Sequence, residues 1–108
     1  MADEADRTEI GARTTVAGDI EAQQDVVVFG RVEGSIASTG AVIVEEGGMA
    51  RAMIRAAHVL VAGAVVGDIR AAERIEITEN GRVLGDVYTP RLILQDGGAV
   101  RGRVVMDG

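Results

Sequence analysis

The sequence predicts an all-β fold: a single-domain, right-handed parallel β-helix of about six turns of about 17 residues, triangular in cross-section. Three observations predict it. A glycine-centred pentapeptide recurs along the chain, short strand-like runs lie between its copies, and a further glycine stands just before the later copies. All three series share a period close to 17 residues, which indicates stacked copies of one structural unit.

The pentapeptide has the form Val, any residue, Gly, any residue, and Ile or Val. Its copies are VAGDI, VEGSI, VVGDI, VLGDV and VRGRV, and they begin at Val16, Val32, Val65, Val83 and Val100. A degenerate copy, ARAMI, begins at Ala50 and carries Ala52 at its central position. The six central positions are 16, 18, 15, 18 and 17 residues apart. We expect the degenerate copy to mark a bulged turn.

Three-residue runs lie between the pentapeptides, at 26–28, 42–44, 59–61, 75–77 and 92–94. The positions two residues before and after the middle of each run are mostly polar, and residues i and i+2 of a strand share a face. The middle residue is therefore expected to face solvent, and the outer two residues are expected to face the core. The expected core columns are Val26, Val42, Val59, Ile75 and Leu92, and Val28, Val44, Val61, Ile77 and Leu94.

The local composition of these segments favours strands over helices. They are short, β-branched and bounded by Gly, Asn or Asp. An antiparallel sandwich has no reason to repeat one residue type every 17 residues, whereas strands stacked in register at about 4.8 Å align like side chains in columns. Intervals of 15 to 18 residues favour a three-sided right-handed coil over the left-handed hexapeptide type. Pro90, the only proline, is expected at a corner.

The overall composition excludes several classes of function. Of the 108 residues 47% are hydrophobic but only 2% are aromatic, so Val, Ile, Leu and Ala must form the core. The absence of cysteine excludes disulfides and thiolate sites, and the absence of lysine excludes Walker-type phosphate loops. The net charge of −6 argues against direct binding of nucleic acid.

Three segments are expected: an acidic, flexible N-terminal leader at 1–11, the β-helix domain at 12–106 and a C-terminal stub at 107–108. The leader has no basic start or apolar stretch of the kind a signal peptide needs. Direct membrane binding through it is not expected, and the predicted location is the cytoplasm. Its charged residues are Asp3, Glu4, Asp6, Arg7 and Glu9.

No catalytic residue, cofactor or metal site is predicted. His58 is the only histidine, whereas a γ-type carbonic anhydrase needs three histidine ligands. A hexapeptide acyltransferase needs only one, but it also needs the strict hexad that this sequence lacks. Asp68 and Asp86 share a repeat position, yet two carboxylates fall short of the ligands that Ca²⁺ requires.

The pentapeptides VEGSI, VVGDI and VLGDV, together with TPRLIL and QDGGAVRGRV near the C-terminus, resemble the bactofilin family. The resemblance covers roughly residues 10–106. It implies a triangular right-handed β-helix that self-assembles without nucleotide into non-polar filaments and serves as a scaffold for cell shape, wall synthesis or chromosome positioning. The implied partners are further copies of the chain, paralogous bactofilins or recruited client proteins, and the implied filaments lie in the cytoplasm, near the membrane where partners hold them there.

The two ends of the coil are the predicted polymer contacts. A solenoid end exposes unpaired backbone groups and open core, and the few residues after Val104 are too short to cover it. The predicted interface residues are Val16 and Ile20 at the first turn, and Leu92, Leu94, Val100, Val104 and Met106 at the last turn.

A second candidate surface is a lateral or partner face formed by the outward residues Val27, Ile43, Leu60 and Ile93, with Glu76 interrupting the row. Ordinary β-propensity on an exposed strand explains this row equally well. The alternative function is therefore a non-polymerising β-solenoid adaptor that binds a protein partner through this apolar face.

Overall fold

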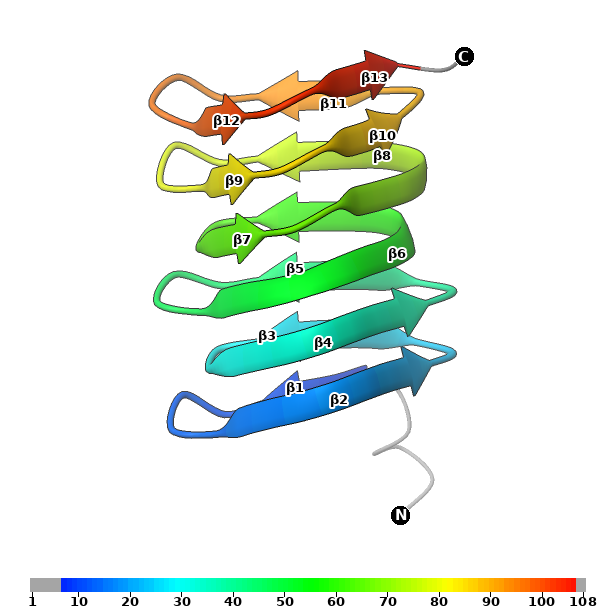
Figure 1. Cartoon of the computed structure of the whole chain (residues 1–108), viewed down its shortest axis with the longest axis vertical. Helices are drawn as coiled ribbons and strands as arrows, with labels where there is room; N and C mark the ends of the chain where they lie inside the picture. Colours follow the sequence, from blue (N-terminus) through cyan, green and yellow to red (C-terminus); the bar gives the residue numbers. More distant parts are fainter. Residues whose placement is uncertain (1–6, 107–108) are drawn as a thin grey trace.

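The computed structural model describes residues 7–106 and consists of thirteen strands that pair in parallel throughout this range. The strands stack as a coil whose turns climb from the N-terminal to the C-terminal end (Figure 1). Their bounds are β1 Arg7–Ile10, β2 Thr15–Ala22, β3 Asp25–Val28, β4 Arg31–Ser38, β5 Ala41–Val44, β6 Met49–Val61, β7 Ala64–Val66, β8 Ile69–Ile77, β9 Arg82–Leu84, β10 Val87–Thr89, β11 Leu92–Leu94, β12 Ala99–Arg101 and β13 Val104–Met106.

The coil has three faces and about six turns of about 17 residues, as predicted. The first face comprises β1, β3, β5, the end of β6, the end of β8, and β11. The second face runs from the start of β2 through β7 and β9 to β12, and the third runs from the end of β2 to β10 and β13. Near strands run to the right and far strands return to the left while the chain climbs, so the coil is right-handed (Figure 1).

The central glycine of the pentapeptide forms the corner between the second and third faces. Gly18, Gly34, Gly67, Gly85 and Gly102 all have φ between 128° and 142°, a region that favours glycine. From the second turn onward, the glycine also lies against the backbone of the turn beneath it. A Cβ on Gly34, for example, would overlap the carbonyl oxygen of Gly18.

The degenerate pentapeptide does not form a bulged turn, and that expectation is wrong. Ala52 has no positive φ, and β4 and β6 pair without interruption from Arg31 with Met49 to Ala37 with Arg55. The register shift of this strand lies instead between Ala56 and His58, where β6 pairs with β8. An alanine is accommodated because β6 passes the corner with an ordinary strand conformation.

The second glycine series closes the corner between the first and second faces. A Cβ on Gly30, Gly63 or Gly81 would overlap carbonyl oxygens of the preceding turn. The backbones of successive turns therefore approach here too closely for any side chain. This steric requirement explains why a glycine recurs just before the later pentapeptides.

The core consists of stacked columns of aliphatic side chains. The two columns predicted from the three-residue runs are buried from Val26 to Ile75 and from Val28 to Ile77, each residue being at most 1% exposed. Further columns come from the other two faces and include Val32, Ile36, Ile54, Ile69 and Val87. Each side chain packs on its equivalent one turn away, as in-register stacking requires.

Two predictions of the sequence need correction. Residues 7–10, assigned to a flexible leader, form β1 in register with β3, and Ile10 is part of the core. The β-helix therefore begins at least five residues earlier than residue 12, while residues 1–6 and 107–108 lie outside the described range. Val27, expected to face solvent, is only 4% exposed.

The described residues form no helix that is long and apolar enough to cross a membrane.

Candidate polymer interfaces at the two ends of the solenoid

The C-terminal turn opens the core. Leu94 continues the column of Ile77 but is 48% exposed, and Val104 continues the column of Val87 but is 38% exposed. Met106 stacks on the buried Thr89 and is itself 61% exposed. Register partners on a parallel ladder share a face, so these residues occupy the same positions as their buried equivalents on the turn beneath. No described turn lies beyond them (Figure 1).

The other two predicted residues of this end are less open. Leu92 and Val100 are half-buried and pack against the core. Each covers the turn beneath it and is itself uncovered on its outer side. All five predicted residues therefore belong to one terminal turn, formed by β11, β12 and β13.

The N-terminal turn is open to a smaller extent. Val16 and Ile20 lie on β2, are half-buried and pack against the core, as does Ala22 on the same strand. Ala22 was not predicted, because a lone alanine gives no apolar signal in the sequence. β2 pairs with β4 on one side only within the described range. Consistent with this open side, no atom of another turn in this range lies within 4 Å of the place where a Cβ on Gly18 would stand.

The two ends thus present different surfaces. The C-terminal turn exposes larger apolar side chains than the N-terminal turn does. Full burial of an exposed Val, Leu or Met contributes about 1.5–3 kcal/mol. Because these side chains are about half exposed, covering the C-terminal turn would contribute roughly half of that for each, together with the backbone hydrogen bonds of an extended ladder.

The predicted lateral face is only partly exposed. Val27, Ile43, Leu60, Glu76 and Ile93 do form one column, because they are register partners on successive turns. Val27 is buried, Ile43 and Leu60 are half-buried, and Ile93 is 36% exposed. The apolar surface is therefore discontinuous, with its open parts on the third, fourth and sixth turns.

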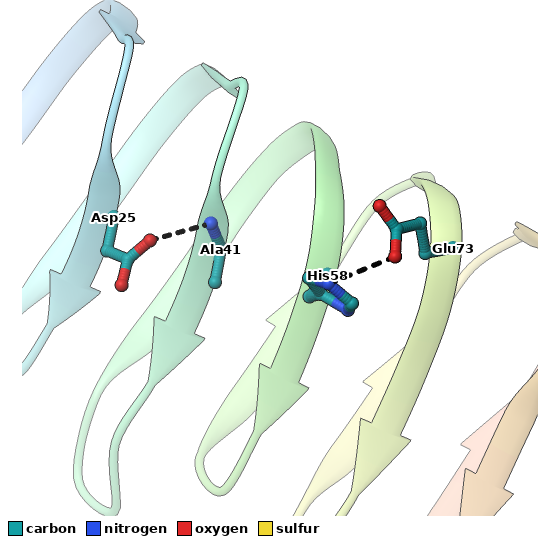
Figure 2. A network of polar contacts seen from close by, with 4 residues as sticks. All are labelled: Asp25, Ala41, His58 and Glu73. Carbon is teal, nitrogen blue, oxygen red and sulfur yellow. Dashed lines mark hydrogen bonds and ion pairs between the residues drawn. The ribbon is translucent and has the colours of Figure 1, made fainter.

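Polar side chains follow the corner between the third and first faces (Figure 2). The Ala41 N–H donates to Oδ1 of Asp25 on the preceding turn, at 3.0 Å. Two turns further, Nε2 of His58 lies 3.3 Å from Oε1 of Glu73. The His58 and Glu73 side chains are solvent-exposed to a large extent. Nδ1 of His58, however, is buried and has no hydrogen-bond partner. The contacts connect neighbouring turns, which is a structural role.

Asp68 and Asp86 also connect turns. Oδ1 of Asp68 accepts the Asp86 N–H, and Oδ1 of Asp86 accepts the Arg103 N–H, both at 3.4 Å. Each carboxylate therefore satisfies a backbone donor next to a corner glycine, where the strand ladder is interrupted. Arg70, on the neighbouring strand, lies with its guanidinium 5.0 Å from the centre of the Tyr88 ring. No group of three or more potential metal ligands occurs in residues 7–106.

Comparison with known proteins identifies the family. The family model of the bactofilins, described as polymer-forming cytoskeletal, matches residues 8–105. The chain is 40% identical over 101 residues to bactofilin BacP of Myxococcus xanthus, which covers 94% of this chain and 42% of BacP. It is 36% identical over 100 residues to bactofilin BacO of the same organism, which covers 93% of this chain and 79% of BacO. No solved structure gives a significant match.

The chain belongs to the bactofilin family of polymer-forming cytoskeletal proteins. It spans less than half the length of BacP and about four fifths of BacO. The matched region covers the β-helix except for its first and last residues, Arg7 and Met106, so the rest of both terminal turns lies inside the family domain.

Proposed function

We propose that the chain polymerises end to end, through its two terminal turns, into filaments that form without nucleotide. The observation that supports this most strongly is the opening of the core columns at the C-terminal turn, where Leu94, Val104 and Met106 are exposed. A second copy stacked on this turn would bury these side chains and pair with the free edges of β11, β12 and β13.

The proposed filaments are non-polar, so that like ends meet. This part of the proposal depends on the family resemblance. Such a contact is isologous, with the same surface contributed by both copies. When like ends meet, the filament contains two kinds of contact: one between two C-terminal turns and one between two N-terminal turns. These contacts differ because the two ends expose different amounts of apolar surface.

The proposed cellular role is that of a cytoplasmic scaffold that organises cell shape, wall synthesis or chromosome positioning. Further partners of the scaffold would be client proteins and paralogous bactofilins. Co-polymerisation with a paralogue is supported by the presence of BacO and BacP in one organism. The alternative of a non-polymerising adaptor has less support, because Val27 is buried and Glu76 interrupts its apolar face.

Electron microscopy of the purified protein without nucleotide tests the proposal. We expect filaments for the unmodified chain and none for Leu94→Arg, because a guanidinium placed on the open core cannot be desolvated by a stacked copy. The control is Gln95→Arg, which adds the same charge at the neighbouring exposed residue and should leave filaments intact.

Circular dichroism distinguishes loss of the contact from loss of the fold. Leu94→Arg should keep the β-sheet spectrum, since only the outermost turn is changed. Filaments formed by a folded Leu94→Arg protein would show that the contact lies elsewhere. An unmodified protein that stays monomeric at all concentrations would contradict polymerisation itself.

A further inference from the structure

The corner between the first and second faces is formed by loops of unequal length. The first, third, fifth and sixth turns have loops of four residues, which stand out on the left of Figure 1, whereas the second and fourth turns have only two residues there. The bounds of the long loops are 11–14, 45–48, 78–81 and 95–98. The last three of these loops each carry an exposed carboxylate, on Glu46, Glu79 and Asp96. We call these three residues the acidic ridge.

A hydrogen bond joins two loops of the acidic ridge. Nδ2 of Asn80 donates to Oε2 of Glu46 at 3.1 Å. This bond reaches from the fifth turn to the third, past the short fourth-turn loop at 62–63. The carboxylates of the ridge are therefore held along one edge of the coil.

The second face, which follows this corner, carries exposed arginines on the same three turns. Arg51, Arg82 and Arg101 lie on β6, β9 and β12, at positions that point away from the core. No carboxylate of residues 7–106 forms an ion pair with any of them. Glu33 is the outward carboxylate of this face, and it lies beneath Arg51 and two residues from Arg31. Four arginines against one carboxylate leave the face positively charged.

The acidic ridge and these arginines match turn by turn. When two copies lie side by side in the same direction, with equal turns at equal height, the ridge of one copy faces the arginines of the third, fifth and sixth turns of the other. On the fourth turn neither the loop nor β7 is charged. On the first turn the loop carries Arg13, but the outward residues of β2 opposite it, Thr15 and Ala17, are uncharged. No loop then meets a like charge on the facing strand.

The opposite direction fits less well. Antiparallel copies with the first turn beside the sixth bring Arg13 of one copy opposite Arg101 of the other, where like charges repel. Shifted by one turn, antiparallel copies bring Asp96 opposite Arg31, which shares its strand with Glu33. In the parallel arrangement the partner of Asp96 is Arg101, whose strand carries no carboxylate. Charge complementarity of this kind fixes direction and register more than it adds affinity.

We propose that the second face docks the acidic ridge of a second copy, side by side and in the same direction. The contact is heterologous, because the two copies contribute different surfaces. It is independent of the end-to-end contact, since it uses the side of the coil. It also depends on charge, so salt should weaken it, whereas a contact through the apolar residues Ile43 and Leu60 would persist in salt.

Disulfide trapping tests this contact, since the chain has no cysteine of its own. Two proteins are mixed and oxidised, one with Asn80→Cys on the fifth-turn loop and one with Ala99→Cys, which stacks on Arg82 in the second face. Both carry Leu94→Arg, so that the proposed end contact is absent. We expect disulfides between the two proteins, because Cα atoms within about 7 Å can be bridged. The absence of such links would overturn the proposal.

A second cysteine position tests the direction of the pair. Met49→Cys replaces Ala99→Cys in the same column of the second face, three turns lower. We expect it to link to Asn80→Cys less than Ala99→Cys does. Preferential linking to Met49→Cys would show an antiparallel pair and overturn the parallel arrangement.

Charge reversal provides the second readout. Replacing the three arginines with Glu in both proteins should slow disulfide formation at least about three-fold, the factor expected for three exposed ion pairs, and high salt should also slow it. Reversing the acidic ridge in the same chains should restore the rate, because opposite charges then face each other again and the net charge returns to its starting value. The substitutions are Arg51→Glu, Arg82→Glu and Arg101→Glu, followed by Glu46→Arg, Glu79→Arg and Asp96→Arg.

A matched control separates this contact from general repulsion. Arg55→Glu, Arg70→Glu and Arg74→Glu change the net charge by the same amount at exposed residues outside the second face, and should slow the reaction much less. Equal slowing by this control, or no recovery after the double reversal, would overturn the proposal.

Discussion

Gly34 lies directly on Gly18 of the preceding turn, so closely that a Cβ on Gly34 would overlap the Gly18 carbonyl oxygen. Gly18 has the same backbone conformation, with φ of 128° against 130°, but a Cβ on Gly18 would meet no atom of another described turn within 4 Å. Substitution of Gly18 therefore tests backbone strain alone, whereas substitution of Gly34 tests backbone strain together with steric overlap between turns.

We predict that Gly34→Ala destabilises the coil more than Gly18→Ala does. Both substitutions force alanine into an unfavourable φ, at a cost of about 1–3 kcal/mol. Gly34→Ala also pushes two turns apart, which adds about 1–3 kcal/mol. Urea unfolding followed by circular dichroism measures the difference. Equal losses of unfolding free energy would mean that the stacked turns can separate at this corner without cost.

A second prediction concerns Thr89, which is 1% exposed beside the corner formed by Pro90. Its hydroxyl donates to the Arg91 carbonyl at 2.8 Å and accepts the Arg91 N–H at 3.2 Å. Thr89→Val keeps the shape but removes both bonds, so we expect a loss of about 1–3 kcal/mol in unfolding free energy. Thr89→Ser, which keeps the hydroxyl, should lose about 0.8 kcal/mol for the missing methyl group. A Val variant as stable as the Ser variant would contradict the role of the hydroxyl.

A third prediction concerns the bond between Asp25 and the Ala41 N–H (Figure 2). Asp25→Ala removes the acceptor, and because the site is exposed water can partly replace it. We expect a loss of about 0.5–1.5 kcal/mol in thermal or urea unfolding. Asp25→Asn retains a carbonyl acceptor at the same place and should recover most of the stability. If Asn were no better than Ala, the contact would contribute nothing to the stacking of the turns.

The partly exposed apolar column provides a fourth prediction. Ile43→Thr with Leu60→Thr should reduce lateral bundling in electron micrographs and spare single filaments, because these residues lie on a side of the coil and not at its ends. Val66→Thr with Leu84→Thr is the matched control on the second face. Bundles unchanged by the first pair, or reduced equally by both pairs, would show that this column has no special part in lateral contact.

Most of the fold was predictable because each turn repeats the last. Parallel stacking in register places Val26 beneath Val42 and Val28 beneath Val44, so the period of the sequence is also the period of the structure. The same logic assigned Leu92, Val100 and Val104 to the last described turn, which β11, β12 and β13 form. The extent of the first turn was missed because Arg7–Ile10 pairs with β3 without any pentapeptide or glycine to mark it.

The sequence by itself determined the solenoid and its register, because in a periodic coil equivalent positions share one environment. Only the tertiary structure decided where that equivalence fails. Val27 is buried although later members of its column are more exposed. Ala52 occupies a corner at which the other turns have glycine, and the third face is recessed at its alanines. The physical reason is that burial and corner geometry depend on what lies across the turn and beside the strand, and these neighbours are set by the packed chain rather than by the repeat.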